Sequence, residues 1–307
     1  MRGVCITTRQ REAPLKATLA AIAPVLAPQV ARIGRAEPGA GWLRRADLLT
    51  GAGLDAMVRE LRQAYGYDRE VAVSSFLAAY TAGVAGPAIA TYVVRHRVPD
   101  LAADGLALHG APGGWFDVTA FHTERMTVLP DDPMLADGAR LADGGVRPDD
   151  PVRPDAGTVR ATIDVVEDHA ALRLRLVTNL VEHLEPLVLA LRPRARLGLP
   201  ALWGAVATQC GRAFLLTERV TGDPDIGRME ADAFFALACP PMRARPTWSD
   251  FTHRGRRQTA MRRGSCCLVH RMSGQYCTTC PFTSDSERER RLREWIDTQG
   301  DEGLAVG

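Results

Sequence analysis

The sequence predicts an α+β fold that is predominantly helical. Apolar residues recur at helical spacing through much of the first 240 residues, which favours a helical body. Two β-prone segments flank a glycine-rich turn within residues 105–128 and predict a small β-hairpin or sheet. After residue 240 the composition shifts to arginine and cysteine. We therefore expect a helical body over 1–240 and a short cysteine-rich segment over 241–307.

The bulk composition is that of an ordinary globular protein. The 307 residues are 46% hydrophobic and 24% charged, which is enough to bury a sizeable core. A net charge of +2 gives no general attraction to nucleic acid. Because no run of about 20 apolar residues is present, no integral membrane segment is expected. Arg9, Arg11 and Glu12 interrupt any signal-peptide core, which predicts a cytoplasmic location, either free or peripheral to the inner membrane face.

The first hundred residues are expected to be mainly helical. An Ala- and Leu-rich helix is predicted over 12–35, with interruptions at Pro24 and Pro28. A longer stretch of apolar and small residues over 70–98 predicts a second helix, which Gly86-Pro87 should kink or split.

The middle of the chain changes character. Residues 105–109 and 115–118 flank a turn and indicate a β-hairpin. Residues 129–158 are rich in Asp, Pro and Gly, and predict a mobile loop or linker. Further helices are expected over 54–65, 159–191, 200–214, 228–239 and 285–298.

Four of the seven cysteines lie within fifteen residues, at Cys266, Cys267, Cys277 and Cys280. A CxxC pair suits metal ligation because two intervening residues let both sulfurs converge on one ion. The adjacent pair is harder for a single tetrahedral zinc to accept, since side chains diverge from Cα atoms only about 3.8 Å apart. A two-iron cluster spreads its ligands over two metals and is therefore favoured. Structural zinc and disulfides remain alternatives.

The other three cysteines lie in or near apolar runs. We expect Cys5, Cys210 and Cys239 to be buried as small hydrophobic residues.

Arginines surround the clustered cysteines. Arg262 and Arg263 come shortly before Cys266, and Arg271 follows within the spacer. Such charges could raise the potential of a cluster and attract an acidic redox partner or an anionic chelate. A solvated basic face is the alternative interpretation, and the sequence leaves both open.

Three motifs resemble the FhuF-type ferric-siderophore reductases. The family's C-terminal signature is matched by three consecutive parts of this chain. They are Arg262-Arg263-Gly264-Ser265-Cys266-Cys267-Leu268, a spacer with Gly274, and Cys277-Thr278-Thr279-Cys280-Pro281. Upstream, residues 74–80 with Gly86-Pro87 resemble the family's apolar helix, and Leu202-Trp203-Gly204 resembles its Leu-Trp-Gly-Asn-type helix start. The resemblance covers residues 60–297. The spacer is one residue shorter than the family's, and Ala205 stands where the family has Asn.

The resemblance implies a [2Fe–2S] cluster held by Cys266, Cys267, Cys277 and Cys280. It also implies one-electron reduction of ferric iron in a siderophore complex, of hydroxamate type, with release of ferrous iron in the cytoplasm. No catalytic residue beyond the cluster ligands is needed. Because no nicotinamide or flavin motif is visible, electrons are expected from an external ferredoxin- or flavoprotein-type donor. The alternatives are a structural zinc-binding scaffold or siderophore-binding protein, and an iron–sulfur sensor.

Overall fold

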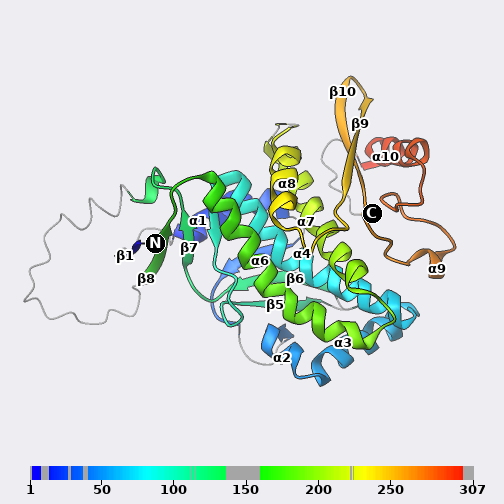
Figure 1. Ribbon diagram of the computed structural model, residues 1–307, viewed down its shortest axis with the longest axis horizontal. Helices are drawn as coiled ribbons and strands as arrows, with labels where there is room; N and C mark the ends of the chain where they lie inside the picture. Colours follow the sequence, from blue (N-terminus) through cyan, green and yellow to red (C-terminus); the bar gives the residue numbers. More distant parts are fainter. Residues whose placement is uncertain are drawn as a thin grey trace, which may run out of the picture.

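The fold is α+β and predominantly helical, as the sequence predicts (Figure 1). The computed structural model describes residues 2–7, 14–26, 29–36, 41–111, 113, 115–135, 160–221, 223 and 225–299. The helices are α1 (Pro14–Leu26), α2 (Arg45–Leu49), α3 (Ala52–Tyr65), α4 (Arg69–Arg95), α6 (His169–Leu191), the 3-10 helix η1 (Arg192–Arg194), α7 (Leu199–Thr221), α8 (Ile226–Leu237), α9 (His270–Ser273) and α10 (Asp285–Gln299).

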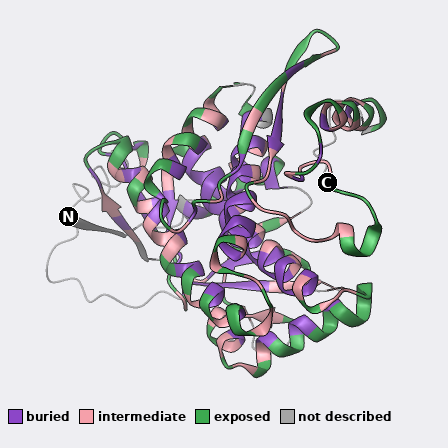
Figure 2. Ribbon diagram, turned by 45° about the vertical axis from the view of Figure 1, so that its right-hand side comes forward, coloured by how far each residue is buried: buried purple, intermediate pink, exposed green. Residues whose placement is uncertain are grey.

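Helix α4 is the centre of the body. It packs against α7, α1, α3, α6 and strand β6 (Trp115–Phe121), and most of its side chains are buried. Among the described helices, α4 alone is long and apolar enough to cross a membrane, yet 78% of the qualifying stretch is buried inside the fold. That burial is typical of the core helix of a water-soluble protein. Figure 2 shows the buried residues gathered in these central helices.

Helix α4 is not split at Gly86-Pro87, which excludes one of the two predicted outcomes, a kink or a split. The helix runs unbroken through Pro87, and Asp68 caps its start by accepting a hydrogen bond from the Val71 amide. Pro87 has no amide proton to donate to the carbonyl of Gly83, four residues earlier. The Thr119 hydroxyl of β6 donates to that carbonyl instead, at 2.7 Å. A contact distant in sequence thus satisfies the group that the proline leaves unpaired.

Two four-stranded sheets and one hairpin carry the strands. The first sheet has the order β1 (Arg2–Thr7), β8 (Arg160–Val165), β7 (Arg125–Val128) and β4 (Arg97–Pro99); the second has the order β2 (Val30–Ile33), β6, β5 (Leu106–Ala111) and β3 (Trp42–Leu43). Strands β5 and β6 pair antiparallel, which confirms the predicted hairpin. The hairpin is part of a larger sheet, because β2 and β3 join its two edges.

Two predicted helices are too long. The first ends at Leu26, includes Pro24, and is followed by strand β2 where helix was expected. The helix predicted over 159–191 begins only at His169, because β8 occupies residues 160–165 and Asp168 caps the helix. In both places pairing with distant strands, β6 and β7, decides the structure over local helical pattern.

The predicted loop over 129–158 is described only as far as residue 135. Its start is fixed to the body, since the Arg97 guanidinium binds the carboxylate of buried Asp132 at 2.7 and 2.8 Å. The mobility of the loop remains a prediction. Residues 136–158 lie outside the described chain.

Helices α6 and α7 confirm the predicted apolar stripes. The periodic leucines of α6 from Leu172 to Leu191 are buried, as are Trp203 and Phe214 of α7. Cys210 is buried as expected, whereas Cys239 is exposed because it follows the end of α8. The side chain of Cys5 lies outside the described part of the chain.

The C-terminal segment begins with a β-hairpin that the sequence did not predict. Strands β9 (Thr247–His253) and β10 (Arg256–Arg262) pair antiparallel and project from the body, with α10 beside them (Figure 1). Phe251, Ala260 and Ile296 form a small separate hydrophobic cluster between the hairpin and α10. The clustered cysteines lie in the loop that connects β10 to α10.

Candidate metal centre

The structure brings the four clustered cysteines together in two pairs. The sulfur of Cys266 lies 3.9 Å from that of Cys280. The thiols of Cys267 and Cys277 share a hydrogen bond. Each member of the adjacent pair therefore faces one member of the CxxC pair.

Backbone conformation separates the adjacent cysteines. Leu268 has φ +62°, a left-handed value that is uncommon for a residue with a side chain. Gly274 ends α9 in the same region, at φ +71°, and turns the chain back toward the CxxC pair. These two turns let consecutive residues 266 and 267 direct their sulfurs to different partners.

Backbone groups favour the thiolate form of the cluster's sulfurs. The Leu268 amide donates to Cys266 at 3.4 Å. The backbone of Val269, Thr279 and Phe282 acts to lower the pKa of Cys267, Cys277 and Cys280 in turn. Such interactions stabilise sulfurs in the thiolate form, which is the form that binds metal.

Their mutual hydrogen bond, burial and one arginine set the electrostatics of the Cys267–Cys277 pair. The shared hydrogen bond favours a thiolate on Cys277 and lowers its pKa to about 5, while the same bond and burial raise the pKa of Cys267. The positive charge of Arg263 favours the thiolate at both positions. Burial raises the pKa of Cys280 to about 11. The surroundings therefore favour the thiolate form at Cys277.

The three predicted arginines lie in different places. Arg263 donates to the Thr279 hydroxyl at 2.8 Å and so holds the CxxC turn. Arg262 forms an ion pair with Asp285, with 3.4 Å between the guanidinium and the carboxylate. Arg271 forms an ion pair with Asp68 at 2.9 Å, which ties the cysteine loop to the start of α4. Of the three, only Arg263 acts directly on the sulfurs.

Sequence reasoning missed the residue that organises the CxxC turn. Arg288 of α10 is 1% exposed, and its guanidinium donates to the carbonyls of Thr278, Cys280 and Thr283 at 2.8–3.1 Å. It also pairs with Asp285. Arg288 stands among many charged residues in a helix that the sequence presents as solvated, so no local signal distinguishes it from its neighbours.

Two glycines let the cysteine loop lie directly against the body. A side chain on Gly204 of α7 would overlap Ser265, and one on Gly264 would overlap the backbone of Ala244. Gly204 belongs to the Leu-Trp-Gly motif, and Ser265 precedes Cys266. The upstream motif and the cysteine signature therefore meet in space.

An inner cavity of about 700 Å³ lies between the body and the cysteine loop. Helices α1, α4 and α7 and the start of β6 form most of its wall. Arg263, Cys267, Val269 and Cys277 close it on the side of the loop. One sulfur pair thus borders a space large enough for a small molecule.

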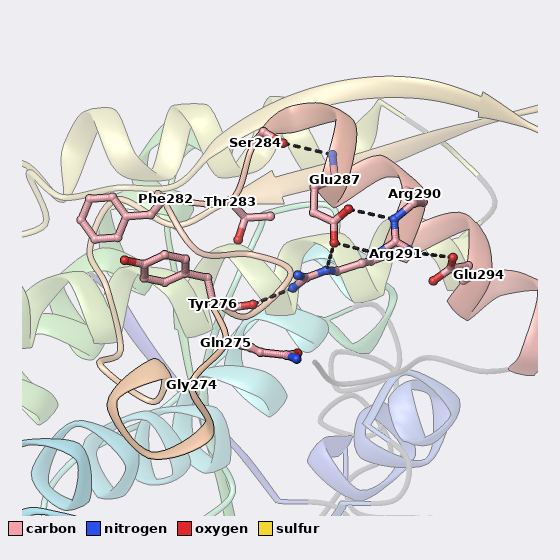
Figure 3. A pocket seen from close by; sticks show the side chains of 10 residues that line it. All are labelled: Gly274, Gln275, Tyr276, Phe282, Thr283, Ser284, Glu287, Arg290, Arg291 and Glu294. Carbon is pink, nitrogen blue, oxygen red and sulfur yellow. Dashed lines mark hydrogen bonds and ion pairs between the residues drawn. The ribbon is translucent and has the colours of Figure 1, made fainter.

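An outer recess lies between the cysteine loop and α10 (Figure 3). Tyr276 and Phe282 line it, and their rings lie 5.5 Å apart. Its charges pair with one another, since Glu287 binds both Arg290 and Arg291. Arg291 also donates to the Tyr276 carbonyl at 2.6 Å, which joins α10 to the loop.

The donor set fits a [2Fe–2S] cluster. Such a cluster takes four thiolates, and the four thiols lie in two facing pairs. Within the part of the chain that the structure describes, no three His, Cys, Asp or Glu side chains are already arranged to hold one metal ion. His270 lies 3.6 Å from the Cys266 sulfur and adds a neighbouring imidazole.

No protein-family model matches the chain, and no curated protein matches it. The resemblance to the FhuF-type reductases therefore rests on the motifs alone.

Proposed function

We propose that this protein is a cytoplasmic ferric-siderophore reductase that carries a [2Fe–2S] cluster on Cys266, Cys267, Cys277 and Cys280. The observation that carries the proposal is that the four thiols lie in two facing pairs beside a cavity of ligand size. The motif resemblance to the FhuF-type family supports the same assignment.

The residues of the chain prepare the site for one-electron chemistry. A bound [2Fe–2S] cluster supplies one electron at a time. Arg263 and the amide donors stabilise the negative charge of the sulfurs, and hydrogen bonds of this kind tune the potential of such a cluster. No side chain needs to move a proton in the transfer.

The electron balance requires two partners. Ferric iron in the chelate gains one electron and becomes ferrous, which hydroxamate oxygens hold far more weakly. A ferredoxin- or flavoprotein-type donor loses one electron in the same turnover. The chain thus releases iron by changing its oxidation state.

Anaerobic reduction tests the proposal. Protein purified without oxygen should be coloured, and its visible spectrum should bleach on reduction. A ferric trihydroxamate should restore the oxidised spectrum, while a ferrous-specific dye should report about one ferrous ion for each electron delivered.

Two other outcomes would replace the proposal. Colourless protein with bound zinc would indicate a structural zinc site on a scaffold or siderophore-binding protein. A coloured, reducible protein that stays reduced in the presence of the chelate would indicate an iron–sulfur sensor.

A further inference from the structure

The inner cavity has the size and position of a ligand site. Its volume of about 700 Å³ lies within the range of pockets for drug-sized ligands. It is enclosed by the body on one side and by the Cys267–Cys277 pair on the other. A molecule held there would contact the sulfurs directly.

Small residues on one face of α4 create the space. Ser75, Ala78, Ala82 and Gly86 recur at helical spacing, line the cavity and are half-buried, whereas most of the other positions of α4 are fully buried. The remaining wall is largely apolar and includes Phe116. This surface suits the methylene spacers of a flexible chelate.

Two polar side chains stand in the largely apolar wall of the cavity. Ser74 of α4 and Gln209 of α7 line it, and each is 7% exposed. The Ser74 hydroxyl and the Gln209 amide are hydrogen-bond donors, so they suit the oxygen atoms of a ligand.

Charge at the cavity favours a ligand rich in oxygen atoms. Arg212 and Arg263 bring two guanidinium groups to its wall. The one carboxylate there, Asp117, binds His109 at 2.7 Å. Amide and guanidinium donors together match carbonyl and hydroxamate oxygens.

We propose that the inner cavity binds the ferric hydroxamate chelate, with Gln209 and Ser74 as donors to its oxygens and Ala78 and Ala82 against its spacers. This proposal rests on the proposed function. Bound in this way, the iron centre lies against the Cys267–Cys277 pair. A cluster held by Cys266, Cys267, Cys277 and Cys280 would pass one electron from the external donor to the ferric iron, which becomes ferrous with no bond to the protein formed or broken.

Filling the cavity tests the proposal on the anaerobically purified holoprotein. Ala82→Trp should weaken binding of a gallium(III) trihydroxamate, a chelate of matching charge that is not reduced, by about tenfold or more in calorimetry. It should slow reduction of the ferric trihydroxamate similarly. The cluster spectrum and the reduction of ferricyanide, which needs no pocket, should stay unchanged. Gln209→Leu should weaken binding by about fivefold.

Controls keep the outcome clear. Ala56→Trp places the same side chain at an exposed position of α3 and should change none of these values. If Ala82→Trp does not fold, Ala78→Leu fills the same space more gently.

The site and the function can fail separately. Unchanged gallium chelate binding by the filled variants, or no binding by the wild type, would overturn the site. Binding that the filled variants abolish, without any reduction by the wild type, would sustain the site and overturn the reductase function.

Discussion

The helical body and the cysteine-rich segment are stabilised by different forces. The body is built around one large core that runs from Leu15 to Met242. The segment has a hydrophobic cluster of only three buried residues, and its loop is held by Arg263, Arg288 and Arg271. Apolar burial therefore stabilises the body, whereas charged hydrogen bonds and a bound metal group would stabilise the segment.

Loss of one cysteine is the strongest way to separate the two regions. Cys277→Ser should abolish the bound cluster and its visible absorbance, because it removes one of the four thiolates that would hold the cluster. The helical signal in circular dichroism should remain, since the core lies in the body. Cys239→Ser, at an exposed position outside the site, is the matched control. Global unfolding of Cys277→Ser would show that the regions do not fold independently.

Arg288→Met should destabilise the segment by about 3 kcal/mol, because three buried carbonyls lose a charged donor. The rate of cluster loss to a strong chelator measures this effect. Arg290→Met, in the same helix, removes only exposed ion pairs with Glu287 and Glu294 and should leave the rate of cluster loss nearly unchanged. Equal effects of the two substitutions would contradict the structural role of Arg288.

Acid should act on the body through His183. This buried imidazole donates to the Leu101 carbonyl at 2.6 Å and accepts from the Tyr80 hydroxyl at 2.8 Å, and burial lowers its pKa from 6.5 to about 4. The unfolded chain takes up a proton first as pH falls below 6.5, so folding stability decreases from there toward pH 4. Between pH 7 and pH 5 the expected loss is about 2 kcal/mol.

Urea unfolding at the two pH values measures this dependence. His183→Gln keeps an amide donor and acceptor but cannot titrate. Between pH 7 and pH 5 the variant should therefore lose about 2 kcal/mol less of its unfolding free energy than the wild type. A wild type and variant with the same pH dependence would exclude His183 as the acid-sensitive group.

The junction of the two regions depends on a close approach. Gly204→Ala places a methyl group on Ser265 and should cost about 1–3 kcal/mol, seen as faster cluster loss. Adding Ser265→Gly should restore most of that loss, because it removes the overlapping atoms. Gly198→Ala meets only an ordinary contact with Pro200 and should be nearly neutral. If the double variant is no better than Gly204→Ala, the contact does not couple the regions.

Local pattern predicted much of the fold. The leucine period of α6, the stripe of α7 and the turn between β5 and β6 each appear within short windows, so their residues alone indicate the element. Strands β2 and β8 could not be predicted in this way. Strand β2 pairs with β6, which lies far along the chain, and β8 pairs with β7 across a long insertion.

The sequence by itself determined the four thiols, their spacing and the division into a helical body and a cysteine-rich segment. Residue type and periodicity are local properties, so they can be read without coordinates. Only the tertiary structure decided which cysteine faces which, that Pro87 is tolerated inside α4, that Arg288 is buried, and that a cavity borders Cys267 and Cys277. Each of these depends on contacts between residues distant in sequence, which packing alone brings together.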